Sequence, residues 1–136
     1  MFEIFDHTAD LGLRIRAPSR RELFIEAGRA LFSLLVANLD QVRCTETRNL
    51  AIEGREDDYL LFDWLSELLY LFDAQHLVFS EFDVELEPAG IQAAVHGEPV
   101  DLARHKLEHD VKAITYHGLK VERTWEGWQA EVIVDI

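Results

Sequence analysis

The sequence predicts an α+β fold, a two-layer sandwich in which two amphipathic helices lie on one face of a mixed β-sheet. Two stretches repeat apolar residues at the helical spacing of about 3.6, and six or so stretches alternate apolar and polar residues as strands do. The 136 residues contain no Pro/Gly/Ser-rich linker and no internal repeat, so residues 1–136 are expected to form one domain.

The first strand and the first helix are predicted from an alternation that a cap follows. Leu11 to Ala17 alternates apolar and polar side chains, which is typical of a half-buried strand. Ser19 and Glu22 then have the spacing of a capping box, in which each side chain accepts a hydrogen bond from the other residue's backbone N–H. The helix that they begin is expected to end near Asn38.

The second strand and the second helix are predicted in the same way. Arg43 to Ile52 is expected to be a strand, and Gly54 ends it. The carboxylates of Asp57 and Asp58 suit the positive end of a helix dipole, and apolar residues at helical spacing continue from there to about Gln75.

The second half of the chain is expected to be mainly β-structure. Alternation on both sides of Pro88-Ala89-Gly90 predicts a hairpin between Phe82–Glu87 and Ile91–Val95. A polar loop at 97–110 follows, of a length that often carries function. Two more strands, at about 111–123 and 129–136, complete the predicted sheet.

Composition limits the classes of function. Lys and Arg total 13 against 26 Asp and Glu, and the net charge of −13 would repel phosphate backbones, so no direct nucleic-acid binding is expected. An acidic chain suits a basic protein surface or cations, or the acidity simply keeps the protein soluble. Cys44, the single cysteine, cannot form an internal disulfide. No apolar run is long enough for a membrane span and no signal peptide is visible, so the cytosol is the expected location.

The segment Asp6-His7-Thr8-Ala9-Asp10, directly before the first predicted strand, is a candidate site. Two carboxylates, an imidazole and a hydroxyl suit a hard cation or a proton transfer. The alternative is a polar turn in which Asp and Thr side chains bond nearby backbone amides.

The segment His105-Lys106-Leu107-Glu108-His109 fits H-x-x-E-H, the inverted zinc-protease pattern. That pattern needs a stable helix, which places both histidines on one face, and a distant third ligand. This segment lies in a polar loop, so we reject a zinc protease and assign no role to His105, Glu108 or His109.

Near the end of the chain, Val111-Lys112-Ala113-Ile114-Thr115-Tyr116-His117 alternates as a strand. Alternation groups Lys112, Ile114 and Tyr116 on one face, which could contact an anion or a protein partner. An edge strand blunted with charge would have the same pattern.

The chain ends in Val132-Ile133-Val134-Asp135-Ile136, a β-forming run that is expected to hold the last residues in the sheet. The Asp135 side chain then lies beside the Ile136 α-carboxylate. Paired carboxylates of this kind suit Ca²⁺ or Mg²⁺ better than zinc.

Together these segments resemble the archease family over nearly the whole chain. The resemblance rests on Asp6-His7-Thr8-Ala9-Asp10-Leu11-Gly12, on Val111-Lys112-Ala113-Ile114-Thr115-Tyr116-His117 and on the terminal Val132–Ile136. It implies a protein that is not an enzyme but activates an RtcB-type RNA ligase in tRNA splicing and RNA repair, by promoting guanylylation and multiple turnover of the ligase. It also implies metal ligands at Asp10, Asp135 and the Ile136 carboxylate, with functional contacts at Lys112 and His7.

The implied ligand set agrees with the predicted strands. Asp10 precedes one strand, and Asp135 with Ile136 ends another, so neighbouring strands could bring these ends together. About three carboxylates would then surround one divalent cation, either Ca²⁺ or Mg²⁺, with Mn²⁺ as a further candidate. Clustered carboxylates repel one another unless a cation neutralises them.

Two other functions stay open from the sequence. A metal-dependent hydrolase would use Asp10, His7 and His105 around an activated water. A general chaperone, or a modulator of an RNA-modifying enzyme, would act through an apolar patch and would need no metal.

Overall fold

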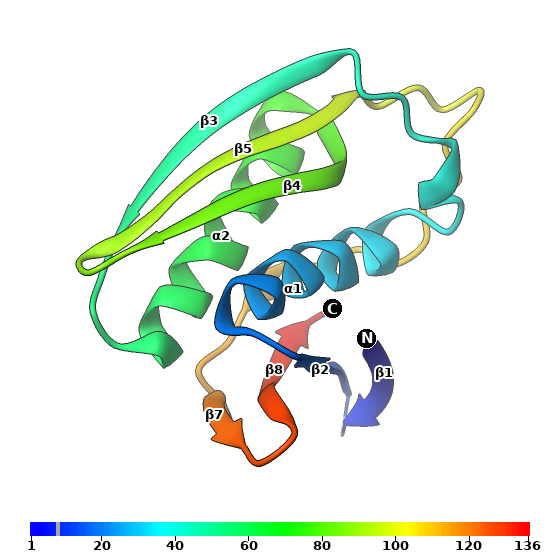
Figure 1. Cartoon of the computed structure of the whole chain (residues 1–136). Helices are drawn as coiled ribbons and strands as arrows, with labels where there is room; N and C mark the ends of the chain where they lie inside the picture. The colour runs from blue at the N-terminus through cyan, green and yellow to red at the C-terminus, as the bar shows by residue number, and fades with distance from the viewer. Residues whose placement is uncertain (8) are drawn as a thin grey trace.

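The computed structural model describes residues 1–7 and 9–136, and within them the chain forms two α-helices, one short 3-10 helix and eight strands (Figure 1). In chain order these are β1 (Phe2–His7), β2 (Asp10–Ala17), α1 (Arg20–Leu35), η1 (Leu39–Gln41), β3 (Glu46–Glu53), α2 (Asp57–Gln75), β4 (Leu77–Glu87), β5 (Gly90–Pro99), β6 (Ala113–Ile114), β7 (Lys120–Thr124) and β8 (Gly127–Asp135). None of these helices is long and apolar enough to cross a membrane.

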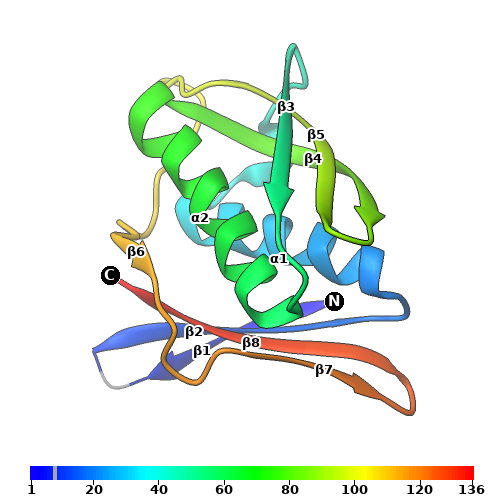
Figure 2. The same ribbon diagram turned by 90° about the vertical axis from the view of Figure 1, so that its left-hand side faces the viewer.

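The strands form two sheets, and the pairs in both are antiparallel. The five-stranded sheet has the order β1-β2-β8-β6, with β7 also paired to β8. The three-stranded sheet has the order β3-β5-β4. Figures 1 and 2 show both helices between the two sheets.

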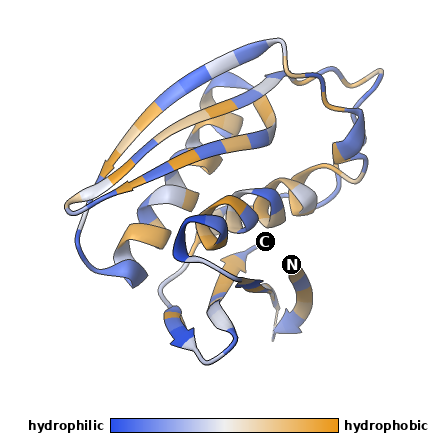
Figure 3. Cartoon of the chain, in the orientation of Figure 1, coloured by the Kyte–Doolittle hydropathy of each residue, from blue (hydrophilic) through white to orange (hydrophobic). Residues whose placement is uncertain are grey.

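The predicted α+β class and its two helices are confirmed, but the layers differ from the prediction. Two antiparallel sheets enclose the helices, whereas one mixed sheet with helices on one face was expected. The reason lies in α1, where Phe32 and Leu35 are buried as well as Leu23, Ala30 and Leu34, so that the buried residues extend around more than one face of the helix. In Figure 3 the strands of the three-stranded sheet alternate polar and apolar residues, so this sheet presents one face to the helices.

Both helices begin where the sequence predicts. The Ser19 hydroxyl accepts a hydrogen bond from the Glu22 N–H at 3.2 Å, which is one half of the capping box. Helix α1 ends at Leu35, earlier than predicted. Helix α2 is fixed against α1 by Trp64, which is fully buried and donates its indole N–H to the Phe24 carbonyl at 2.9 Å.

Two differences from the predicted strands concern the functional region. The sequence did not predict β1, an edge strand whose side chains are at most half-buried. The strand predicted at 111–123 is interrupted between β6 and β7. Gly118 lies there with a φ of 65°, a left-handed conformation that turns the chain.

Candidate metal centre

The candidate site lies at one end of the five-stranded sheet, where β1 ends, β2 begins and β8 ends (Figure 2). The register of β1 with β2 pairs His7 with Asp10. The register of β2 with β8 pairs Leu11 with Val134, so Asp10 and Asp135 are the next neighbours across these strands. Cross-strand neighbours have Cβ atoms about 5 Å apart. Carboxylates from the two ends of the sequence therefore meet here.

The carboxylates of Asp10 and Asp135 lie on the outer face of the sheet. Leu11 and Val134 are buried against the helices, and side chains alternate along each strand, so the preceding and following residues point the other way. His7 shares this face, because its Nδ1 lies 3.9 Å from an Asp10 carboxylate oxygen. Ile136, whose α-carboxylate is the predicted third donor, follows Asp135 directly.

This end of the outer face is acidic, and among the described residues no lysine or arginine forms an ion pair with Asp10 or Asp135. Within residues 1–7 and 9–136, no hydrogen bond or ion pair reaches the Asp135 side chain, and Asp10 has only the distant contact with His7. Further along the same face, Arg14 pairs with Glu3 and with Glu131, both at 2.9 Å. Uncompensated carboxylates that lie together repel one another, and a bound cation would relieve that repulsion.

A second histidine, His117, joins the site, and sequence reasoning gave it no role. The ring centroids of His7 and His117 are 5.2 Å apart. The His7 Nδ1 atom is buried and has no hydrogen-bond partner within the part of the chain that is described. A buried polar atom in this state costs about 1–3 kcal/mol, and an additional ligand could satisfy it. His7 belongs to the Asp6–Asp10 segment and His117 to the Val111–His117 segment. That both segments carry the family resemblance is the one sequence signal that could have linked the two histidines.

The available donors fit a divalent cation. Carboxylate oxygens suit Ca²⁺, Mg²⁺ and Mn²⁺. Among the described residues, no three His, Cys, Asp or Glu side chains form one metal-binding group. The predicted set differs from such a group, because it has only two side chains, Asp10 and Asp135, and takes its third donor from the main-chain carboxylate of Ile136.

The turn between β1 and β2 and the close contact of Phe5 with Gly12 shape this end of the sheet. Ala9 has a φ of 62°, a left-handed conformation that costs a non-glycine residue about 1–2 kcal/mol. Thr8, the hydroxyl of the predicted cluster, lies outside the described residues. At Gly12 a Cβ would overlap the Phe5 ring, which crosses β2 there and carries the Arg14 guanidinium 4.8 Å from its centroid.

Lys112 lies beside the carboxylates. Its N–H donates to the Asp135 carbonyl at 2.7 Å, and its side chain is exposed. The predicted grouping of Lys112 with Ile114 and Tyr116 is wrong, because Ile114 is buried while the other two are exposed. Only two residues of this segment form a strand, so alternation does not extend to Tyr116, which stacks on Phe62 at 3.9 Å between centroids.

The H-x-x-E-H segment forms no helix, and its first histidine is part of a buried network. The Asp101 N–H donates to His105 Nδ1 at 2.9 Å, so the ring proton sits on Nε2, which donates to Glu98 at 3.0 Å. Both ring nitrogens are therefore hydrogen-bonded within the protein. His105 is not free to bind a metal or to transfer a proton, which argues against the hydrolase that would use it. The N–H groups of Glu108 and His109 donate to carbonyls in the last turn of α1, a structural role.

Glu98 is the centre of this network, a role that the sequence did not predict for it. Burial alone would raise the pKa of its carboxyl, but hydrogen bonds from Arg104, from the Arg43 N–H and from His105 outweigh burial and lower the pKa from 4.5 to about 2. Glu98 is 5% exposed. The network ties β5, the following loop and the segment after α1 together.

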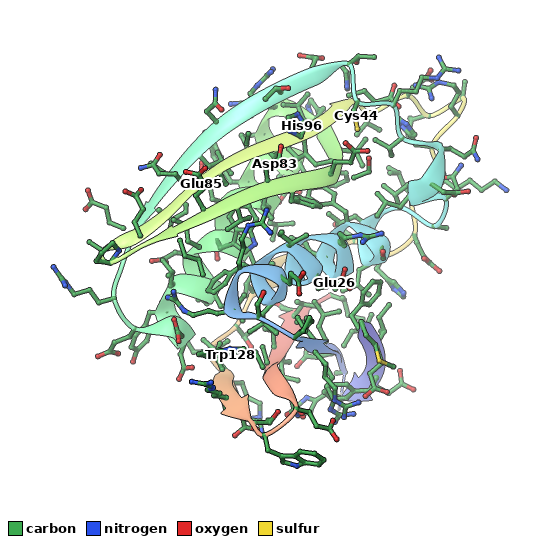
Figure 4. All side chains as sticks on the ribbon, in the orientation of Figure 1. Glu26, Cys44, Asp83, Glu85, His96 and Trp128 are labelled. Atoms are coloured by element: carbon green, nitrogen blue, oxygen red, sulfur yellow. The ribbon has the colours of Figure 1, made fainter. Side chains whose placement is uncertain are left out.

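A third polar group lies on the outer face of the three-stranded sheet, where Figure 4 labels Asp83 and His96 on neighbouring strands. The Thr47 hydroxyl lies 2.9 Å from His96 Nδ1, and His96 Nε2 lies 2.8 Å from an Asp83 oxygen. The order resembles a hydroxyl–histidine–carboxylate triad. Such a triad needs a buried carboxylate, whereas the Asp83 side chain is 74% exposed, so this row is a surface ladder across strands.

Comparison with known proteins gives consistent matches over the full length. The chain matches the family model described as Archease protein family (MTH1598/TM1083) over residues 2–136. It is 39% identical over 139 residues to the protein archease of Methanopyrus kandleri, with 99% of each chain covered. It is 37% identical over 140 residues to that of Pyrococcus abyssi, with 99% of this chain and 98% of the relative covered.

Two solved structures have the same fold. The solution structure of protein 1598 from Methanobacterium thermoautotrophicum matches with a TM-score of 0.83 and 30% identity, over 99% of this chain and 98% of that one. A crystal structure from Thermotoga maritima, of an archease described as a possible chaperone, matches with a TM-score of 0.68 and 22% identity, over 100% of this chain and 98% of that one. At that identity the second match supports the fold alone.

Proposed function

This chain belongs to the archease family, and we propose that it is a metal-binding accessory protein that activates an RtcB-type RNA ligase during tRNA splicing and RNA repair in the cytosol. The observation that supports this most is the position of Asp10 next to Asp135, where neither carboxylate forms an ion pair with a lysine or arginine of the described residues. These are the residues at which the family resemblance implies metal ligands. A net charge of −13 also suits a partner whose surface is basic because it binds RNA.

Asp10, Asp135 and the Ile136 carboxylate would hold the cation, Ca²⁺ or Mg²⁺ with Mn²⁺ also compatible, and His7 lies beside them. When bound, the cation supplies positive charge that can neutralise phosphate oxygens during guanylyl transfer on the ligase. Lys112 is exposed next to Asp135, so its ammonium group can contact a phosphate or a carboxylate of the partner. The chemistry of ligation belongs to the ligase, and this protein promotes its guanylylation and repeated turnover.

A multiple-turnover ligation assay with the RtcB-type ligase of the same organism tests this function. The wild-type chain should raise the number of ligations per ligase, and Asp10→Asn should lose the stimulation while it keeps its circular dichroism spectrum. Asp63→Asn is the matched control, because Asp63 is an exposed residue of α2 outside the site. Full stimulation by Asp10→Asn would contradict the proposal.

A chaperone function is the second candidate, because the exposed apolar side chains of Leu102 and Leu107 could contact an unfolded protein. A chaperone would bind several unfolded proteins, with or without metal, and would not need the Asp10 carboxylate. Suppression of the aggregation of an unrelated unfolded protein, undiminished in Asp10→Asn and in chelator, would favour this function over ligase activation.

A further inference from the structure

A groove between the end of α2 and the loop after β5 has the character of a protein-docking surface. It encloses about 410 Å³ and is lined by Phe72, Asp73, His76, Val100, Leu102 and Leu107. Leu102 is 75% exposed and Leu107 is 49% exposed. Single exposed leucines are common, but two that share one hollow with Phe72 and Val100 form an apolar patch that marks an interaction site. We call it the α2-end groove.

The walls of the α2-end groove are held in place by backbone hydrogen bonds. His76 ends α2 in a left-handed conformation with a φ of 55°, and its carbonyl accepts a hydrogen bond from the Val100 N–H at 2.8 Å. Leu107 forms an isolated bridge with Val36 after α1. A surface that is already ordered loses little conformational entropy when a partner binds, which favours affinity.

The charge at the groove indicates the chemistry of its partner. Asp73 lines the groove, and no lysine or arginine of the described residues does. The pKa of the Asp73 carboxyl is raised, first by burial and then by the charge of Asp110, while His76 opposes this. Two carboxylates near one apolar hollow favour a positively charged group from outside the chain.

We propose that the α2-end groove docks a basic, apolar surface segment of the partner ligase. An apolar side chain of that segment packs between Leu102 and Leu107, and a lysine or arginine next to it pairs with Asp73 and Asp110. A second copy of this chain is a poor occupant, because two chains of net charge −13 repel each other. The inference rests on the proposed function and adds the contact by which the ligase is held.

The groove is linked to the candidate metal centre through a short piece of chain. Asp110 lies two residues before Lys112, whose N–H bonds the Asp135 carbonyl. Figure 2 shows the segment after β5 descending beside α2 to β6, next to the C-terminus. A partner that binds the groove would therefore also face the end of the sheet that carries the carboxylates.

The test measures the affinity of the purified ligase for variants of the full chain by isothermal titration calorimetry. Leu102→Asp should weaken binding about tenfold or more, since it loses an apolar contact and requires a carboxylate to be desolvated against the apolar side chain of the partner. Trp125→Asp is the matched control, because Trp125 is 92% exposed in the turn between β7 and β8 and should bind the ligase as the wild type does. Leu102→Met should restore most of the affinity, since it keeps the apolar volume.

A charge reversal tests the second half of the inference. Asp73→Lys should weaken ligase binding several-fold, and less so in high salt, while Glu87→Lys, at the exposed end of β4, should not. Cation binding to the isolated chain should be the same in Leu102→Asp and the wild type, because neither Leu102 nor Asp73 belongs to the metal centre.

The outcomes separate this inference from the proposed function. A wild-type chain that fails to bind the ligase contradicts the proposed function. If the wild type binds and Leu102→Asp binds equally well, the groove is not the docking site, although the proposed function stands. Loss of self-association, or of binding to unfolded polypeptides, in Leu102→Asp with unchanged ligase binding would assign the groove to a different occupant and would also overturn the inference.

Discussion

The candidate metal centre and the Glu98 network contain the same kinds of side chain in opposite states. In the network, Glu98 accepts hydrogen bonds from His105 and from the Arg43 N–H and pairs with Arg104, and both nitrogens of the histidine are bonded. In the candidate metal centre, Asp10 and Asp135 lie together, and neither forms an ion pair with a lysine or arginine of the described residues.

The difference between the two regions separates structural from functional polar groups. Buried polar groups that satisfy one another stabilise the fold and leave no donor or acceptor for a ligand. Polar groups that are brought together unsatisfied lower the stability of the ligand-free protein, and a bound cation or partner would compensate. Both regions carry motifs in the sequence, H-x-x-E-H in one and the Asp6–Asp10 segment in the other, and only the hydrogen bonds tell them apart.

The largest expected effect is on stability and belongs to the network. Glu98→Ala leaves His105, Arg104 and the Arg43 N–H without their acceptor, so the free energy of unfolding should fall by about 3 kcal/mol. Urea denaturation measures this loss, and Glu87→Ala, an exposed control, should stay within about 0.5 kcal/mol of the wild type. A Glu98→Ala variant as stable as the control would mean that the network does not hold the loop.

The next effect is on cation binding and belongs to the metal centre. Asp135→Asn removes one ligand charge, so its affinity for Ca²⁺ or Mn²⁺ should fall about tenfold or more. Without metal the same variant should be as stable as the wild type or slightly more stable, because a like-charge repulsion is gone. Calorimetric titration measures the fall in cation affinity, and urea denaturation measures the metal-free stability. A large loss of metal-free stability would mean that Asp135 stabilises the fold as Glu98 does.

The pH dependence of stability should report on the Glu98 network. Glu98 has a pKa of about 2 when folded and near 4.5 when unfolded, so its ionised form contributes stability that is fully present above about pH 4.5 and is lost as the pH falls towards 2. The stability difference between wild type and Glu98→Gln should therefore be constant from pH 7 to pH 5 and shrink by pH 3. A difference that grows on acidification would contradict the sign of this shift.

The smallest expected effect comes from the C-terminus. Residues added after Ile136 convert its carboxylate to an amide, so a C-terminal extension should weaken cation binding several-fold, whereas the same extension before Met1 should not. Titration calorimetry on the two tagged proteins makes the comparison. Equal affinities would remove the Ile136 carboxylate from the ligand set and leave the two aspartates.

Local patterns predicted the helices and the hairpin around Pro88, because the capping residues, the apolar spacing and the turn residues all lie close together in the sequence. The approach of Asp10 to Asp135 was also accessible, since each residue lies at the end of a predicted strand. The pairing that makes them neighbours depends on strand order, and strand order depends on contacts that no local pattern carries. The division into two sheets was missed for the same reason.

Two other features were hidden from the sequence for physical reasons. The edge strand β1 buries little, so its alternation between Phe2 and His7 is weak. The partners of Glu98 come from two segments far apart in the sequence, and the approach of His117 to His7 joins residues from opposite ends of the chain. Such satisfaction of polar groups is a property of the folded chain alone.

The position of a bound cation tests the central claim most directly. Crystals grown with Mn²⁺ should give an anomalous diffraction peak between the carboxylates of Asp10, Asp135 and Ile136, and crystals with Ca²⁺ should place the ion about 2.3–2.6 Å from their oxygens. The assignment would be contradicted if a saturating concentration of either ion gave no peak at this end of the sheet. A peak at the Glu98 network would contradict it as well.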